Sequence, residues 1–141
     1  MHRFLKKQEG VASIEFVFIF VVFFMLFYGM VTLALPLILS ATYEELSAEG
    51  LREAVTLRSR QPDIGQIDTA VKAVIKDTWL PAQWVQFCDG YPNSFLKVNG
   101  SVWSVCIGHN NPSSILPEIN LLGFDIVKLP DKIRGEAIIS F

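Results

Sequence analysis

Glu15 is the residue whose type and position most clearly predict chemistry. It stands directly before an apolar run, since no charged residue occurs from Phe16 to Tyr43. A carboxylate at the edge of a membrane span is costly, so it is a functional hypothesis by default. If the chain is cut after Gly10, Val11 gains an amine with a pKa of about 8, and Glu15 becomes the fifth residue. In a staggered bundle of such helices, the carboxylate can meet the amine of a neighbouring copy, which removes much of the cost of either charge alone.

The two cysteines predict a second kind of chemistry. Cys88 and Cys106 both follow the apolar run. In an exported segment a disulfide is the expected state of two such cysteines. Closing a loop of about 19 residues would add about 3 kcal/mol to the stability of a small head in the chain-entropy treatment. The alternative is two separate buried thiols.

The remaining candidates form no catalytic or metal-binding pattern. Of the two histidines, His2 lies in the N-terminal basic segment, and His109 has no carboxylate or cysteine at ligand spacing. The sequence contains no nucleophile motif, phosphate-binding loop or H-E-x-x-H motif. We therefore expect no enzyme activity, no cofactor and no metal.

Three tryptophans could serve either of two purposes. Trp79, Trp84 and Trp103 are expected in the core of a disulfide-linked head. The alternative is an aromatic platform that binds a sugar or another surface.

The apolar run is expected to cross a membrane. The 24 residues from Phe16 to Leu39 would reach about 36 Å as a helix, enough to cross a hydrocarbon core of about 30 Å with some tilt. Basic residues precede the run and acidic residues follow it, so the positive-inside rule places the N-terminus in the cytoplasm. From Ser40 onward there are 12 acidic and 9 basic residues, a net charge of −3. No basic patch supports nucleic-acid binding.

Signal peptides share this layout of a basic segment followed by an apolar run, but their apolar regions are shorter, about 7–15 residues, and end at a small-residue cleavage site.

The junction of leader and span points to something more specific. Gly10, Ala12, Glu15 and Phe16 form a pattern in which a basic leader ends in Gly and Glu-Phe follows before an apolar helix. Gly29 lies late in the span, and residues 48–55 read Ala-Glu-Gly-Leu-Arg-Glu-Ala-Val.

Over about residues 8 to 56, these motifs resemble the TadE/TadF-like minor pilins (pseudopilins) of the tight-adherence (Tad, or Flp) type IV pilus system. The resemblance implies that a prepilin peptidase cuts between Gly10 and Val11, and that Glu15 and Phe16 direct processing, assembly or both. The implied partners are this peptidase, other pilin and pseudopilin subunits, and the assembly platform in the inner membrane. The implied location is single-pass in that membrane, with a periplasmic head that could enter an extracellular pilus.

The span carries an aromatic stripe. Phenylalanines recur at steps of three and four residues, which places them on one helix face: Phe16, Phe20, Phe23, Phe24 and Phe27. They could pack against neighbouring pilin helices or face lipid, and the spacing does not decide between the two. Pro36 is expected to kink the helix near residue 32.

The helix is expected to continue to about Arg58 with an apolar face that packs on the head. This face comprises Tyr43, Leu46, Gly50, Leu51, Ala54 and Leu57. Gly50 either weakens this helix by about 1 kcal/mol relative to Ala or marks a close approach to another element.

The head is predicted to be α+β. A second helix should open at Asp63 or Gly65 and stop at Pro81, with Ile67, Val71, Val74 and Ile75 on its apolar face. A strand is expected over residues 84–88. A hairpin over residues 95–106 should turn at Asn99-Gly100 in a type I′ turn, so that the cysteines link the first strand to the third. A final strand is expected over residues 136–141.

Together these expectations give a three-part chain. Residues 1–10 would be a cleaved cytoplasmic leader, residues 11–59 a long transmembrane helix extending into the head, and residues 60–141 a small pilin-like head with a second helix and a short antiparallel sheet. The expected function is that of a minor pilin that takes part in pilus assembly or adhesion by lateral packing of its N-terminal helix. The alternative is an uncleaved, signal-anchored periplasmic adaptor or adhesin of an envelope complex.

Overall fold

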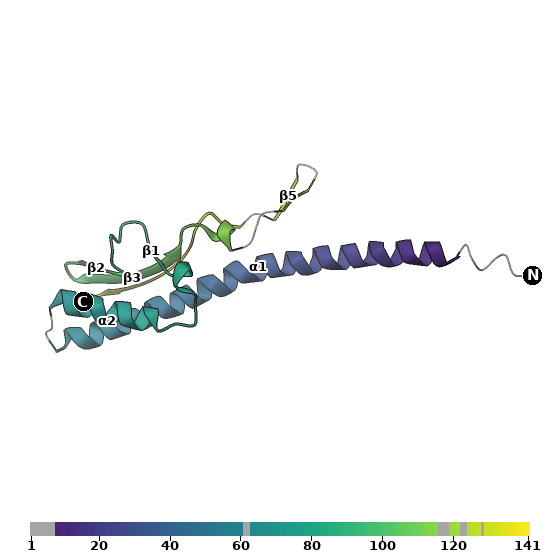
Figure 1. Ribbon diagram of the computed structural model, residues 1–141. Coiled ribbons are helices and arrows are strands. Elements are labelled where there is room, and N and C mark those ends of the chain that lie inside the picture. The colour runs from purple at the N-terminus through teal and green to yellow at the C-terminus, as the bar shows by residue number, and fades with distance from the viewer. Residues whose placement is uncertain (1–7, 61–62, 116–118, 122–123, 128) are drawn as a thin grey trace, which may run out of the picture. The chain divides into compact units, whose positions relative to one another are not determined.

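The computed structural model describes residues 8–60, 63–115, 119–121, 124–127 and 129–141 (Figure 1). Most of the predicted leader, residues 1–7, therefore lies outside the described residues, as do Gln61 and Pro62 between the two helices. The chain divides into two compact units, Met1–Ala34 and Leu35–Phe141. The first is called the membrane unit below and the second the head.

The longest element is helix α1, which runs without interruption from Gln8 to Arg58 (Figure 1). The predicted end of this helix is confirmed. Pro36 lies inside α1 and does not end it, and the kink near residue 32 stays a prediction. In the turn before Pro36, the Thr32 hydroxyl donates to the backbone carbonyl oxygens of Tyr28, at 3.0 Å, and Gly29, at 2.9 Å.

Helix α2 spans Ile64–Lys76 and begins as predicted at Asp63, whose carboxylate accepts a hydrogen bond from the Gly65 N–H at 3.3 Å. Its buried residues are Ile67, Val71 and Ile75, with Val74 half-buried. The prediction that α2 continues to Pro81 is wrong. The chain leaves the helix at Asp77, and the residues that follow bring Leu80 into the core at 5% exposure.

The main sheet is antiparallel and centred on β3 (Val102–His109). Strands β1 (Gln86–Phe87) and β2 (Leu96–Asn99) pair with successive parts of β3, whereas β6 (Ile133–Ser140) pairs with its whole length. The predicted strand 84–88 is thus only two residues long, because Ala82–Trp84 forms a 3₁₀ turn, η2. The final strand begins three residues earlier than expected, since residues from Ile133 onward pair with the far end of β3.

The hairpin of β2 and β3 is confirmed, but its turn is shifted by one residue. Asn99 still pairs with Val102, so the two loop residues are Gly100 and Ser101. Gly100 has φ +60°, whereas neither Asn99 nor Ser101 has a positive φ. A positive φ at the first loop residue alone is the pattern of a type II′ turn, not type I′.

A second, two-stranded sheet was not predicted. It consists of β4 (Ile119–Leu121) and β5 (Phe124–Val127), which pair antiparallel. A second 3₁₀ turn, η3 (Pro112–Ser114), precedes it.

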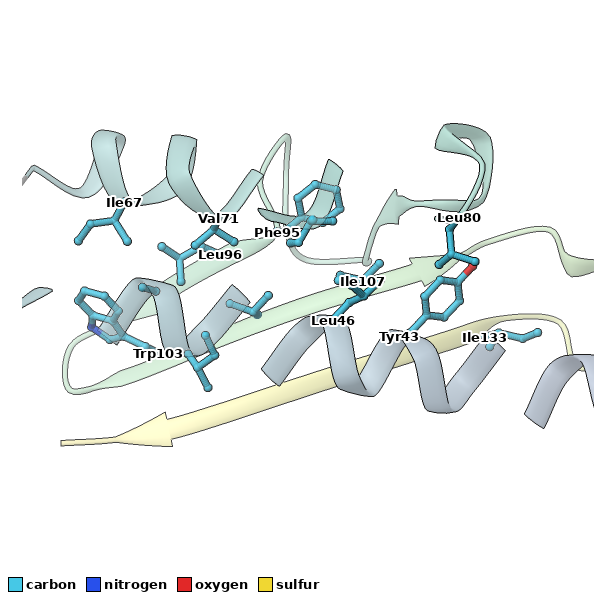
Figure 2. Close-up of a cluster of buried hydrophobic side chains, with 14 of the residues drawn as sticks. Tyr43, Leu46, Ile67, Val71, Leu80, Phe95, Leu96, Trp103, Ile107 and Ile133 are labelled. Atoms are coloured by element: carbon cyan, nitrogen blue, oxygen red, sulfur yellow. The ribbon is translucent and has the colours of Figure 1, made fainter. Parts of the chain in front are cut away.

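The core of the head lies where α1 and α2 face the main sheet (Figure 2). From α1, Tyr43 and Leu46 point into it; Ile67 and Val71 come from α2, and Ile107 comes from β3. The α+β class predicted from the sequence is confirmed.

Two glycines allow the elements of the head to approach closely. A Cβ at Gly50 would lie 3.4 Å from side-chain atoms of both Val71 and Val105, so Gly50 is a contact point of α1 with α2 and β3. A Cβ at Gly135 of β6 would overlap the backbone of Tyr43 and Glu44 in α1.

The other face of the sheet is covered by the loop after β1. Cys88 in this loop is joined to Cys106 of β3 by a disulfide, with the Cα atoms 5.8 Å apart. The Tyr91 hydroxyl shares a hydrogen bond of 2.6 Å with Ser104 and donates to the Glu136 carboxylate at 2.7 Å. The predicted pairing of the cysteines is confirmed, but the link to β3 starts from the loop directly after β1 and not from the first strand itself.

Candidate functional site

The Gly10–Val11 bond lies in the first turn of α1, which begins at Gln8. Both residues are exposed, and a Cβ at Gly10 would meet no described atom within 4 Å. The space around Gly10 therefore does not require glycine for packing. Glycine lowers the cost of opening a helical turn by about 1 kcal/mol relative to alanine, and an opened turn is easier for a protease to reach than a closed one.

Glu15 lies one helical turn beyond Val11 and is exposed. Residues four apart are neighbours on a helix surface, with Cβ atoms about 5–6 Å apart. A free amine at Val11 would therefore lie on the same face as the Glu15 carboxylate. The Val11 amine and the Glu15 carboxylate can therefore pair within one chain or between neighbouring copies. The sequence spacing alone does not reveal that both pairings are possible.

The aromatic stripe of the membrane unit consists of two rows of stacked or tilted rings. The ring centroids of Phe16 and Phe20 are 6.3 Å apart, and those of Phe20 and Phe24 are 6.0 Å apart. Phe23 and Phe27 form the second row, at 6.5 Å. All five side chains are more than half exposed, so the predicted residues come together on a face that nothing in the described membrane unit covers.

A shallow groove of about 380 Å³ lies beside this stripe. It is lined by Ser13, Ile14, Val17, Phe18 and Val21. Sequence reasoning did not identify it, although the i, i+3, i+4 and i+7 spacing of Ile14, Val17, Phe18 and Val21 could have. A ridge of large rings and a groove of smaller side chains on one helix are the two complementary surfaces that helix packing uses.

Among the described residues, α1 alone is long and apolar enough to span a membrane. The last residues of the apolar run belong to the head and pack in it, since Leu39 is buried in its core at 3% exposure and Leu35 is half-buried. Within the membrane unit every residue from Gly10 to Phe27 is exposed, whereas Tyr28 and Val31 are half-buried and Thr32 is 2% exposed. As a helix, Phe16 to Ala34 would span about 28 Å at 1.5 Å per residue, close to the thickness of a hydrocarbon core.

The head contains one buried histidine. His109 is 3% exposed, and its Nε2 lies 3.3 Å from the Ser114 hydroxyl. Within the described part of the chain, its Nδ1 has no hydrogen-bond partner. Desolvation by burial lowers the pKa of His109 below its usual 6.5, although a backbone hydrogen bond at Asn111 opposes the shift. No group of three or more His, Cys, Asp or Glu side chains among the described residues could hold a metal ion.

The tryptophans divide between core and surface. Trp103 is 5% exposed and Trp84 packs partly buried against the core, as predicted. For Trp79 the core prediction is wrong, because it is 72% exposed. It lies just beyond the end of α2, in the stretch where the chain turns to bury Leu80, and this turn carries Trp79 outward.

Comparison with known proteins identifies the N-terminal segment. Residues 10–52 match the family model described as TadE-like protein, which confirms the resemblance read from the sequence. The matched segment contains Gly10, Glu15 and the aromatic stripe, and it ends within α1. No curated protein and no solved structure matches the chain.

Proposed function

We propose that this chain, TadE-like over residues 10–52, is a minor pilin of a Tad-type type IV pilus. A prepilin peptidase removes residues 1–10. The mature chain begins at Val11, and its N-terminal helix packs laterally with the helices of other pilin subunits during assembly of the pilus. Its role is structural and not enzymatic.

The observation that carries this proposal is the composition of the exposed membrane unit. From Gly10 to Tyr43 the one charged residue is Glu15, and the residues on both sides of it, from Gly10 to Phe27, are exposed. A simple anchor gains nothing from a carboxylate at this position, because a charge near the bilayer carries a free-energy cost. A subunit that must find one register against its neighbours does gain from it.

The register would be set by charge pairing. The Val11 amine of one subunit and the Glu15 carboxylate of another are each costly in lipid, and pairing offsets much of that cost. Pairing of the same amine and carboxylate within one chain competes with this intermolecular pair, since Val11 and Glu15 lie one helical turn apart. Stacking of the phenylalanine ridge on the groove of a neighbour would favour the intermolecular pair by holding the two helices together.

The orientation follows from the flanking charges. Arg3, Lys6 and Lys7 precede the span, and Glu44 and Glu45 follow it, so the leader is placed in the cytoplasm. The head then lies on the periplasmic side of the inner membrane, where a disulfide is stable. The peptidase would act at the cytoplasmic face of this membrane.

The mass of the protein extracted from its native membranes tests the cleavage. We expect a mature chain that begins at Val11, and we expect Gly10→Ala to retain its leader. Gly29→Ala is the matched control, because a Cβ at Gly10 or at Gly29 meets no described atom within 4 Å, so neither change disturbs the fold. An intact leader in the unaltered protein would support the uncleaved adaptor instead.

The assembly step is tested by Glu15→Gln, which keeps the size of the side chain and removes its charge. We expect normal membrane insertion and normal cleavage but lost or strongly reduced pilus assembly. Glu9→Gln is the control, because Glu9 lies one residue before the cleavage point and leaves with the leader. Normal piliation in the Glu15→Gln strain would remove the register mechanism.

A further inference from the structure

The two sides of α2 carry surfaces of opposite character. On one side is the basic groove, a depression of about 660 Å³ whose lining includes Lys72, Ile75, Lys76, Leu80, Val85 and Phe95. On the other side, towards α1, is the acidic flank, formed by Glu45, Glu49, Asp77 and the exposed Trp79. Along α2, helix periodicity separates them, because residues 72 and 76 lie on a different face from residue 74. Beyond the end of α2, Thr78 lines both depressions.

The basic groove is apolar inside and positive at its rim. Leu80 and Phe95 are buried residues that reach its wall, and Val85 is half-buried. Lys72 is paired with Asp68 at 2.7 Å. Lys76 is exposed, so it supplies most of the positive charge that a bound group would meet.

The acidic flank has the complementary features. Trp79 exposes a large aromatic side chain, 72% accessible, and three carboxylates lie around it in the same depression. Tryptophan is among the residues that most often carry binding energy when they enter an apolar pocket of a partner. Opposite charges at the rim then favour one orientation of the two surfaces.

We propose that the acidic flank of one copy of this chain docks on the basic groove of a second copy, with Trp79 entering the groove and Glu49 facing Lys76. The two surfaces differ, so the contact is heterologous and leaves one unused surface at each end of any pair. Contacts of this kind continue into open helical filaments when their rotation does not close. This inference rests on the proposed function as a pilus subunit, and it gives the head a second assembly contact besides the helix.

Cross-linking between full-length copies in native membranes tests the contact. One tagged copy carries Thr42→Cys on the acidic flank, and a differently tagged copy carries Ala82→Cys in the basic groove. Neither change removes a charge. With a short bismaleimide we expect 42–82 products and little 42–42 product. Equal yields of the two, or no 42–82 product, would overturn the proposal.

Two further variants test the named side chains. Trp79→Ala should lower the 42–82 yield about tenfold, as expected for loss of a central aromatic residue, and Lys76→Glu should lower it by reversing the rim charge. Ile138→Ala is the control, since Ile138 is 63% exposed on β6, outside both surfaces. Correct folding is checked by the mass change of the Cys88–Cys106 disulfide on reduction. An unchanged yield for Trp79→Ala would overturn the contact.

The intact mass of the same samples separates this inference from the proposed function. A cleaved chain without 42–82 products would overturn the head contact and leave the pilin assignment standing. A chain that keeps its leader but forms 42–82 products would overturn the pilin assignment alone.

Discussion

Gly135 has a large influence on the head because β6 touches the backbone of α1 at this residue. Its carbonyl oxygen accepts a buried hydrogen bond of 2.8 Å from the Ser47 hydroxyl. No side chain fits between the two elements, since a Cβ would overlap the Tyr43 and Glu44 backbone. Strand β6 therefore contacts α1 through the backbone of the strand and not through a side chain.

Gly135→Ala should destabilise the head. Overpacking of this kind costs about 1–3 kcal/mol, and each kcal/mol lowers the melting temperature of a domain this size by roughly 4–8 °C. Thermal unfolding of the detergent-solubilised protein measures the change. Ile138→Ala on the exposed side of the same strand is the control, and equal melting temperatures for the two variants would contradict the close contact.

His109 should make the stability of the head depend on pH. Burial lowers its pKa in the folded state below 6.5, so the unfolded chain binds a proton more readily than the folded one. The stabilisation is complete above about pH 6.5 and is lost as the pH falls towards the lowered folded value. Melting temperatures at pH 8, 6.5 and 5 (about 1.5 units on either side of the usual pKa) measure it.

His109→Gln is the comparison for this titration, because carboxylates also contribute to acid unfolding. The variant should lose less stability than the native sequence between pH 6.5 and 5 (about the range in which histidine titrates). Parallel curves for the two proteins would show that His109 does not carry the effect.

At the scale of elements, the disulfide attaches the loop after β1 to the centre of the sheet. The linked residues are 18 apart in the sequence, and a loop of this length corresponds to about 3 kcal/mol of stabilisation. Beyond this covalent link, Tyr91 is hydrogen-bonded to Ser104 and Glu136 on the same face.

The double variant Cys88→Ser/Cys106→Ser should therefore unfold at a lower temperature but keep its helical content below the transition. Circular dichroism of the two proteins, with and without a reducing agent, measures both quantities. Reduction should lower the melting temperature of the native sequence and leave the variant unchanged. A native protein insensitive to reduction would contradict the stabilising role.

The helices could be predicted more fully than the strands. A charge-free run, a capping Asp63 and regular apolar spacing determine most of α1 and α2 locally. The predicted length of β1 is too great because Trp84 and Val85 have strand propensity. In the structure the 3₁₀ turn η2 precedes β1, and only two residues of β1 pair with β3. Strands of three and four residues, such as β4 and β5, are too short for periodicity to reveal.

In the candidate site, too, some features follow from the local sequence and others depend on tertiary packing. The positions of Glu15 and the phenylalanines on the helix follow from its period of 3.6 residues, so the sequence predicted which of them share a face. Trp79 could not be assigned in this way, because it lies in irregular chain after α2, where exposure depends on how Leu80 and its neighbours pack. The basic groove likewise combines α2 with residues up to Phe95, a tertiary arrangement without a local signal.

At the scale of the whole molecule, the two units should unfold separately. The head has a buried core of aliphatic and aromatic side chains from two helices and a sheet. The described part of the membrane unit is one helix, whose residues from Gly10 to Phe27 are exposed. In an apolar medium, the backbone N–H and C=O groups of a helix are satisfied by hydrogen bonds within the helix itself. Heating should therefore melt the head and leave the membrane unit helical.

Circular dichroism in detergent micelles tests this separation. The helical signal should fall in one transition to a plateau well above that of a fully unfolded chain, and the near-ultraviolet signal of the tryptophans should be lost completely in the same transition. A single transition that removes all helical signal would contradict it. Removal of residues 1–10 should not change the midpoint, because the core of the head, among the described residues, begins at Leu35.

The position of β6 has a consequence for how the protein matures. This strand pairs along one whole edge of β3 and contacts α1 at Gly135. Its residues, 133–140, are synthesised after every other element of the described chain. In the orientation proposed above, the central strand has one unpaired edge during export until residues 133–140 have crossed the bilayer, and unpaired strand edges can pair with other chains. A stalled translocation intermediate would then be the species most prone to aggregate, and a chaperone that shields strand edges would be needed at that moment rather than later.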